Sequence, residues 1–327
     1  MKFKIDKFLI SIAIVVFLAY LFPQFGSKSG PLPLDRIASI GISLIFFFYG
    51  LKLSPEKIKS GLKNWKLHLL IQGCTFLFFP IIILCFYPFI HSNYDNNIWI
   101  AFLFLASLPS TVSSSVVMVS IAKGNVPAAI FNASISGLIG IFITPLWLGL
   151  FLNDTNANYN LGEIYTKLIT EVLAPVIIGF LLHRFWGGFA QKHSKYLTLF
   201  DKSVILLIIY KSFSDSFKEN VFSGIDTNDF FIIGIGVITL FYTIYLLTGF
   251  ISKLLSFSIE DTITSQFCGT KKSLVHGSVF AKILFINPSA MGIILLPILF
   301  FHSFQIFIIS FIASQKSNRI VEKGILH

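Results

Sequence analysis

The stretch that decides the fold is residues 105–125, LASLPSTVSSSVVMVSIAKGN. It is apolar enough to enter a membrane, but Pro109 and the hydroxyl residues after it interrupt it. Proline removes a backbone donor and clashes with the preceding turn, so the pattern predicts a helix that breaks and leaves backbone groups unpaired. At membrane depth such groups are tolerated only where they face protein or a water-filled cavity, which indicates a ligand or ion site.

A second apolar stretch, residues 262–285, is interrupted in the same way by GTKKS at residues 269–273. Two broken segments in corresponding positions of two halves are typical of secondary transporters built from inverted repeats. The two stretches therefore predict both an architecture and the place of its site.

The composition is that of a protein with many membrane spans. The 327 residues are 55% hydrophobic and 12% charged, with 38 phenylalanines, and the mean hydropathy is +0.81. Soluble domains carry about 25% charged residues. We therefore predict one membrane domain over residues 1–327, with the lipid bilayer as its surroundings.

Apolar runs of about 17–25 residues can span a bilayer, and the chain contains ten of them. They lie at residues 7–23, 35–53, 66–90, 98–122, 126–152, 164–185, 202–218, 230–256, 262–284 and 288–314. The longest connections are expected near residues 153–163 and 184–202. The broken stretches are the fourth and ninth runs, each the fourth member of a group of five. Since five is odd, the second group must be inverted. We expect an all-α fold of ten transmembrane helices in two inverted five-helix repeats, residues 1–153 and 160–315, with helices four and nine broken and crossing.

The basic residues are concentrated in alternate connections, at the N-terminus, after the second run, after the sixth run and in the C-terminal tail. The positive-inside rule then places both termini in the cytoplasm of a multi-pass protein of the cytoplasmic membrane. The same rule accounts for the formal charge of +10, so nucleic acid is not expected as a partner. The oligomeric state stays open, with a monomer among the alternatives.

Motifs for enzyme or metal chemistry are absent from the sequence. Cys74, Cys85 and Cys268 lack metal-ligand spacing and are expected to be buried free thiols. The chain contains no HExxH, GxSxG or complete P-loop pattern. We expect neither an enzyme nor a bound metal.

Hydroxyl side chains in the first broken stretch can supply oxygen ligands to a substrate or a small cation. These candidates are Ser110, Thr111, Ser113, Ser114 and Ser115. Small polar residues also permit close helix packing, which is the alternative. Asn132 and Ser136, one turn apart in the next run, either complete the site or hydrogen-bond between helices.

Two lysines, Lys271 and Lys272, interrupt the second stretch near mid-depth. A lysine inside a span costs about 2.5–3.5 kcal/mol and normally lines a cavity or has a partner. The alternative is that both snorkel or pair with an acid. An ammonium beside half-helix N-termini would suit a carboxylate, sulfonate or phosphate group. Their neighbours Gln266, Thr270 and Ser273 complete the candidate set.

Three further titratable residues are candidates for proton transfer or gating. Glu171 lies inside the sixth run, where pairing with Lys167 is the alternative. Asp215 lies near the end of the seventh run and is either a gate or merely solvated. His276 either titrates near neutral pH or is a packing residue.

Several blocks of sequence resemble the bile acid:sodium symporter superfamily, in its divergent branch that contains the atypical seventh member of human solute carrier family 10 and bacterial relatives. The blocks are SGPLPLD (29–35), IFFFYGLKLS (45–54), LPSTVSSSVV (108–117), KGNVPAAIFNASISGLIGIFITPL (123–146), YKSFSDSF (210–217) and FCGTKKSLVHG (267–277). The resemblance implies a panel domain of spans one, two, six and seven and a core domain of the other six. It also implies transport of organic anions.

The chain departs from the sodium-coupled branch at the second broken stretch. Aligned on that branch's motif, Gln266 stands at an acidic position, Thr270 at a glutamine and Lys271 at an asparagine. Two unit positive charges 4 Å apart repel by about 4 kcal/mol at an effective dielectric constant of 20. Either desolvation deprotonates Lys271, or its ammonium takes the place of the sodium ion. The coupling ion, sodium or proton, stays open, and no other cofactor is expected.

Two functions follow as hypotheses. The first is a secondary transporter of an organic anion that works by alternating access. The second is a membrane regulator or sensor that binds a solute without net transport, for example in calcium homeostasis or envelope assembly.

Overall fold

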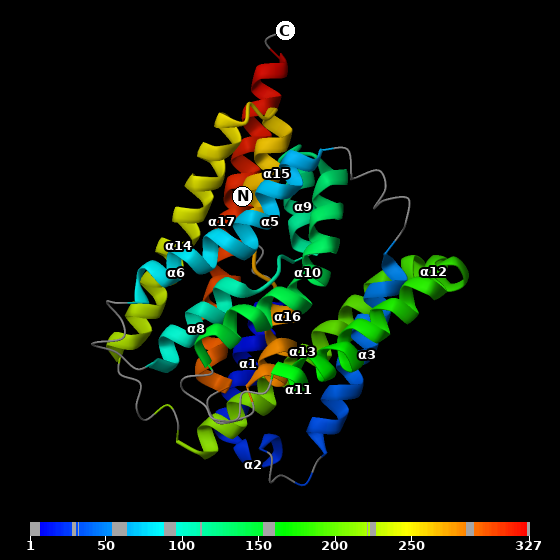
Figure 1. Cartoon of the computed structure of the whole chain (residues 1–327), viewed down its shortest axis with the longest axis vertical. Helices are drawn as coiled ribbons and strands as arrows, with labels where there is room; N and C mark the ends of the chain where they lie inside the picture. Colours follow the sequence, from blue (N-terminus) through cyan, green and yellow to red (C-terminus); the bar gives the residue numbers. More distant parts are fainter. Residues whose placement is uncertain are drawn as a thin grey trace. The chain divides into compact units, whose positions relative to one another are not determined.

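The computed structural model describes residues 7–27, 31, 33–53, 64–87, 96–111, 113–152, 161–220, 222, 227–285 and 291–325. Its regular elements in these ranges are all helices (Figure 1). In the first half they are α1 (Lys7–Leu21), α2 (Pro23–Gly26), α3 (Leu34–Lys52), α5 (Trp65–Gly73), the π-helix η1 (Cys74–Phe78), α6 (Phe79–Cys85), α8 (Asn96–Ser107), α9 (Ser113–Ile121) and α10 (Val126–Leu152). In the second half they are α11 (Leu161–Leu168), the π-helix η2 (Ile169–Leu173), α12 (Ala174–Lys192), α13 (Ser194–Lys218), α14 (Thr227–Leu254), α15 (Ile259–Gly269), α16 (Leu274–Leu284) and α17 (Met291–Ile325).

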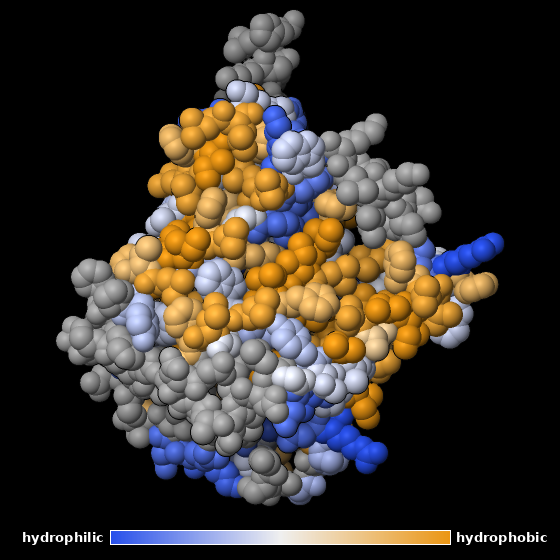
Figure 2. Space-filling model, viewed as in Figure 1, coloured by the Kyte–Doolittle hydropathy of each residue, from blue (hydrophilic) through white to orange (hydrophobic). Residues whose placement is uncertain are grey.

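Six helical segments among the described residues are long and apolar enough to cross a membrane. They are Leu34–Lys52, Trp65–Cys85, Val126–Phe151, Gly162–Lys192, Asn228–Leu254 and Met291–Ser317. Large apolar side chains are exposed, among them Leu181 and Phe185, and Figure 2 shows hydrophobic residues over much of the visible face. Such a surface is stable against lipid rather than water. The chain is an all-helical, multi-pass membrane protein.

Both predicted helix interruptions are present. The first lies between the end of α8 at Ser107 and the start of α9 at Ser113, and the second between Gly269 and Leu274. Pro109 packs against α10 at Gly140, where a Cβ atom would come within 2.8 Å of the proline ring. The first break is therefore fixed by close packing as well as by the chemistry of proline.

The prediction of a long connection at residues 184–202 is wrong. Helix α12 continues to Lys192 and α13 begins at Ser194, so that only His193 lies between them. Hydropathy marks where a chain becomes polar, and a helix can continue past that point because its backbone bonds are internal. Of the other long connection, residues 153–160 lie outside the described part of the chain.

The chain divides into two compact units. The first contains Met1–Ser54, Asn156–Phe230 and Val275–Leu296, and the second contains Pro55–Thr155, Phe231–Leu274 and Pro297–His327. Each unit takes segments from both predicted repeats. The repeats at residues 1–153 and 160–315 stay a prediction.

The first unit is built on two helix pairs, α3 with α12 and α1 with α13. Figure 1 shows α3 (blue) running beside α12 (green). The pair approaches closely at Gly50 and Gly179, where a side chain would collide with the backbone carbonyls of Val176 and Phe47. Small residues permit such contact between membrane helices.

The second unit packs α5 against α15 and α10 against α8 and α9. Ring contacts join α6, α14 and α17 through Phe79, Phe241 and Phe301, at centroid separations of 5.9 and 6.1 Å. Hydroxyl hydrogen bonds add to the apolar packing, for example between Ser252 and Ser265 at 2.7 Å. These contacts surround the two interruptions.

Candidate functional site

The two interrupted stretches contact each other in the second unit. The Ser273 N–H donates to the Pro109 carbonyl at 2.9 Å, and the Ser110 hydroxyl donates to the Cys268 carbonyl at 2.9 Å. The Ser110 N–H donates to the Ser136 hydroxyl of α10, also at 2.9 Å. We call this region, residues 107–115 with 268–274, the crossing.

The Lys272 side chain lies fully buried at the crossing. Its Nζ donates three hydrogen bonds, to the carbonyls of Thr75 (2.7 Å), Ala106 (2.6 Å) and Leu108 (2.8 Å). The ring of Phe79 lies 4.1 Å from the same nitrogen. An ammonium has three donors and no acceptor, so this arrangement satisfies all of them and adds a cation–π contact.

The three carbonyls that bind Lys272 are available for local reasons. In the π-helix η1 the Phe79 N–H bonds to the Cys74 carbonyl, five residues earlier. The next bond of this kind, to the Thr75 carbonyl, would need an N–H on residue 80. Position 80 is a proline, which has none. Ala106 loses its usual partner because the Ser110 N–H bonds to Ser136. Leu108 follows the C-terminal end of α8, where the helix dipole is negative. Together the carbonyls form a cation site, and Lys272 fills it.

The backbone of Lys272 is held by Gln305 on α17. The Lys272 N–H donates to Gln305 Oε1 at 3.0 Å, and Gln305 Nε2 donates to the Lys272 carbonyl at 2.9 Å. Sequence reasoning missed Gln305, Pro80 and Phe79. A glutamine in the middle of an apolar run is the signal that could have indicated the first of them.

The side chain of Lys271 has a different environment from that of Lys272. It is fully buried, and its Nζ has no hydrogen-bond partner among the described residues. The same holds for the buried hydroxyl oxygens of Ser114 and Ser115, in the first turn of α9. These groups belong to the crossing and have hydrogen-bonding capacity that the described protein atoms leave unused.

The remaining hydroxyl residues of the predicted site are Thr111, Ser113 and Thr270. Thr111 is buried. Ser113 begins α9, and its side chain lies outside the described part of the structure. Thr270 donates its hydroxyl to the Gln266 carbonyl at 2.6 Å, within its own helix end.

Gln266 is held away from the crossing by two other helices. Its Nε2 donates to the Tyr245 carbonyl on α14 at 3.2 Å, and its Oε1 accepts from Lys316 on α17 at 3.0 Å. The Gln266 side chain, three residues before the end of α15, therefore bonds to α14 and α17.

Asn132 serves as a bond between α10 and α5. Its side-chain nitrogen lies 2.7 Å from His68 Nδ1, and its side-chain oxygen accepts from Gln72 Nε2 at 3.1 Å. Asn132 therefore hydrogen-bonds between helices, which is the second of the two roles considered from the sequence. Ser136, one turn later, is the member of the pair that contacts the crossing.

Glu171, Asp215 and His276 lie in the first unit. Asp215 is 3% exposed and accepts from Lys211 at 2.9 Å, so the solvated alternative is wrong. His276 is buried against Phe46 and Phe280, with ring centroids 5.5 and 5.7 Å apart. Glu171 lies in η2. Among the described residues it forms no ion pair with Lys167, the partner considered from the sequence.

Within the described ranges no group of three metal-ligating side chains could hold a metal ion. Cys74 and Cys268 are buried free thiols as predicted, but Cys85 is exposed. Cys85 is the last residue of α6, and an apolar neighbourhood in sequence does not require burial in protein, because apolar side chains of a membrane helix also face lipid.

Comparison with known proteins adds an independent line of evidence. The family model described as the SBF-like CPA transporter family matches residues 6–318. The chain is 34% identical to "Uncharacterized protein PA2026" of Pseudomonas aeruginosa over 97% of this chain and 95% of that protein. It is 34% identical to "Putative symporter YfeH" of Escherichia coli over 95% and 92%, and 34% identical to "Sodium/bile acid cotransporter 7-B" of Xenopus laevis over 93% and 90%. The match of the family model over nearly the whole chain shows that this chain belongs to the SBF-like CPA transporter family.

Proposed function

We propose that this protein is a secondary transporter of an organic anion across the cytoplasmic membrane, and that the crossing binds the anion. Membership of a transporter family supports transport as the activity. Relatives are named as a symporter and a sodium/bile acid cotransporter, which supports the choice of an organic anion.

The observation that carries the proposal is the state of Lys271. Its side chain is fully buried and its Nζ lacks a hydrogen-bond partner among the described residues. A charged lysine in a membrane interior costs about 2.5–3.5 kcal/mol, and it normally lines a cavity or pairs with another group. A bound carboxylate or sulfonate would supply that partner, with Ser114 and Ser115 as further donors.

The proposed architecture has ten spans in two inverted repeats, with both termini in the cytoplasm. It is supported by the helix order, in which the fourth and ninth apolar segments are the interrupted ones. In this scheme a core that contains the crossing moves against a panel during alternating access. Broken helices at the midplane are the usual place for a substrate site in such folds.

We further propose that sodium is not the coupling ion, and that Lys272, rather than its neighbour, stands in for a cation. The Lys272 ammonium is bound by three carbonyl oxygens at 2.6–2.8 Å. A sodium ion beside it would be repelled by about 4 kcal/mol at 4 Å and an effective dielectric constant of 20. The tethered charge would also favour an anionic substrate nearby.

The test is counterflow in proteoliposomes. Thermal-shift screening of organic anions, with taurocholate and benzoate among them, first selects a compound that binds. The radiolabelled compound should then exchange across the membrane, and Lys271→Gln should abolish both binding and exchange. The matched control is Lys192→Gln, at an exposed lysine at the end of α12.

Three outcomes of this test are informative. Exchange that is lost in Lys271→Gln and kept in Lys192→Gln supports the proposal. Binding without exchange in the wild-type protein would indicate a solute-binding regulator instead. Exchange that survives unchanged in Lys271→Gln would contradict the assigned site.

A further inference from the structure

A groove in the second unit lies between three helices, α14, α15 and α17, which are neighbours in Figure 1. Its volume is about 310 Å³, near the lower end of the range for ligand sites in proteins. The described residues that line it are Leu246, Gly249, Phe250 and Lys253 of α14, Thr262 and Gln266 of α15, and Lys316 of α17. None of them belongs to the crossing, so the groove is a separate feature of the unit.

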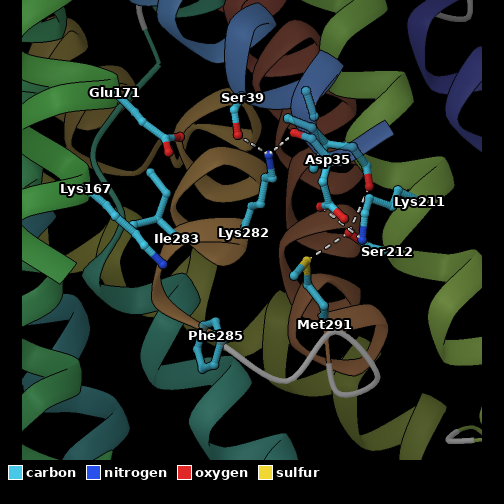
Figure 3. A pocket seen from close by; sticks show the side chains of 12 residues that line it. Asp35, Ser39, Lys167, Glu171, Lys211, Ser212, Lys282, Ile283, Phe285 and Met291 are labelled. Carbon is cyan, nitrogen blue, oxygen red and sulfur yellow. Dashed lines mark hydrogen bonds and ion pairs between the residues drawn. The ribbon is translucent and has the colours of Figure 1, made fainter. Parts of the chain in front are cut away.

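The described lining of the groove is positively charged. It contains two lysines, Lys253 and Lys316, and no acidic residue. The cavity of the first unit differs in this respect, because Asp35 and Glu171 lie among its lysines and Lys211 Nζ is 3.2 Å from the Asp35 carboxylate (Figure 3). Two ammonium groups in a lining without acids attract an anion.

The acidic residues at the start of α15 do not neutralise Lys253. The carboxylate oxygens of Asp261 accept from Asn64 at 2.6 Å and from Asn125 at 2.8 Å, and neither asparagine lines the groove. Among the described residues Lys253 forms no ion pair, either with Asp261 or with the exposed Glu260. Its ammonium is therefore available to a ligand.

Both lysines lie at the ends of membrane-spanning segments. Lys253 is the last residue but one of α14, which has 28 residues and a length of about 42 Å. Lys316 is the last residue but one of the apolar segment Met291–Ser317. A bilayer is about 30 Å thick in its hydrocarbon core and about 40–45 Å with its headgroups. The two ammonium groups are therefore expected at the level of the headgroups.

The apolar part of the groove continues from the lysines towards the middle of the membrane. Leu246 and Phe250 are 66% and 60% exposed. With Lys253 they stand at positions i, i+4 and i+7 of α14, which is one face of the helix. This face is apolar first and charged at its end. A phospholipid has the same order, with acyl chains towards the middle of the bilayer and a phosphate at its boundary.

The floor of the groove is held by hydrogen bonds within the protein. Gln266 donates to the Tyr245 carbonyl at 3.2 Å and accepts from Lys316 Nζ at 3.0 Å, which positions the Lys316 ammonium. At Gly249 a side chain would collide with the Gln266 amide group. The groove is thus formed by packed residues, and less side-chain freedom is lost when a ligand binds.

We propose that this groove binds one phospholipid of the surrounding bilayer, with a net negative headgroup. Lys253 and Lys316 contact the phosphate, since lysine binds phosphate as a point charge. An acyl chain lies along Leu246 and Phe250. The lipid joins the ends of the helices that line the groove and is not the transported solute. The site requires only that the chain is embedded in a membrane, and it is independent of Lys271 and of the transport proposed above.

The test measures which lipids lie beside the groove. The full chain, with Phe250 replaced by the photo-crosslinking amino acid p-benzoylphenylalanine, is placed in nanodiscs of phosphatidylglycerol and phosphatidylcholine in equal amounts and with identical acyl chains. The first lipid is anionic and the second zwitterionic. After illumination, mass spectrometry gives the ratio of the two lipids attached to the protein.

The matched control places the same crosslinker at Phe185 of α12. This residue is 75% exposed and follows the exposed Arg184, but it does not line the groove. The ratio of phosphatidylglycerol to phosphatidylcholine should be at least about fivefold higher at Phe250 than at Phe185, as expected for one further basic residue near the membrane surface. Equal ratios would mean that surface charge alone attracts the lipid, and would overturn the proposal.

Charge variants separate lipid binding from a purely structural role of the lysines. Lys253→Gln and Lys316→Gln should each lower the ratio at Phe250 by about fivefold. Lys253→Arg should keep it, because a guanidinium also binds phosphate, and Lys192→Gln, at the end of α12, should leave it unchanged. An unchanged ratio in Lys253→Gln, or an equal loss in Lys253→Arg, would contradict the site.

Two further measurements identify the source of the anion and separate the groove from the crossing. Glycerol 3-phosphate, a soluble phosphate without acyl chains, should not lower the ratio at Phe250 when added in large excess. A loss of the ratio would indicate a site for a soluble phosphate and overturn the lipid assignment. The ratio should persist in Lys271→Gln, because Lys271 does not line the groove, and its loss there would contradict an independent site.

Discussion

Replacing Lys272 by methionine tests the cation site at the crossing. Methionine keeps an unbranched side chain but cannot donate to the carbonyls of Thr75, Ala106 and Leu108, which bind the lysine at 2.6–2.8 Å. Hydrogen bonds from a charged group contribute about 1.5–3 kcal/mol each. Removing the lysine also recovers roughly 2.5–3.5 kcal/mol of burial cost. The expected loss of stability is therefore about 1–6.5 kcal/mol.

The assay is thermal unfolding of the purified protein in detergent, with size-exclusion chromatography as a second readout. Lys272→Met should unfold at a lower temperature than the wild-type protein, and Lys192→Met, at an exposed lysine, should not. Lys272→Ala leaves space between the same carbonyls, so methylammonium should stabilise it by binding there as a free cation. Methylammonium should not stabilise Lys272→Met, in which the side chain fills that space.

Two results would refute this reasoning. One is an unchanged unfolding temperature in Lys272→Met. The other is equal stabilisation by methylammonium in the alanine and methionine variants, which would show that the amine acts on the detergent or the protein surface. Either result would mean that the three carbonyls do not form a cation site.

Three further predictions follow from the same geometry. Exchange of the transported anion should be unaffected when sodium is replaced by potassium, and strict sodium dependence would contradict the tethered cation at Lys272. Ser114→Val should reduce anion binding at the crossing by about fivefold or more, since a hydrogen bond to a charged group is lost, while Ser203→Val, at an exposed serine of α13, should not; isothermal titration checks both. Gly140→Leu should reduce the yield of folded protein, because a Cβ there meets the Pro109 ring at 2.8 Å. The control Gly188→Leu should not, because a Cβ at that position has open space. An unaltered yield in Gly140→Leu would show that the break tolerates displacement of Pro109.

The neighbouring lysines show how far the sequence could lead at the crossing. Sequence alone indicated that Lys271 and Lys272 interrupt an apolar run and need partners. For Lys271 it left two alternatives, a deprotonated amine or an ammonium in place of the sodium ion, because an alignment of motifs compares positions and not the directions of side chains. The structure instead directs Lys272 into the three carbonyls and leaves Lys271 without a hydrogen-bond partner among the described residues.

The sequence by itself determined the class of the protein, its apolar helices and the positions of both breaks, because these depend on local properties. Hydropathy over a window reports transfer to lipid. Pro109 weakens a helix wherever it is placed, and the glycine, threonine and serine of the GTKKS stretch have low helix propensity. Only the tertiary structure decided which polar groups meet. Lys272 and the carbonyl of Thr75 are 197 residues apart in sequence, and Lys282 and the carbonyl of Asp35 are 247 apart. Such contacts depend on how helices pack, since each buried polar group must find a partner among whatever side chains and carbonyls the packing brings near it.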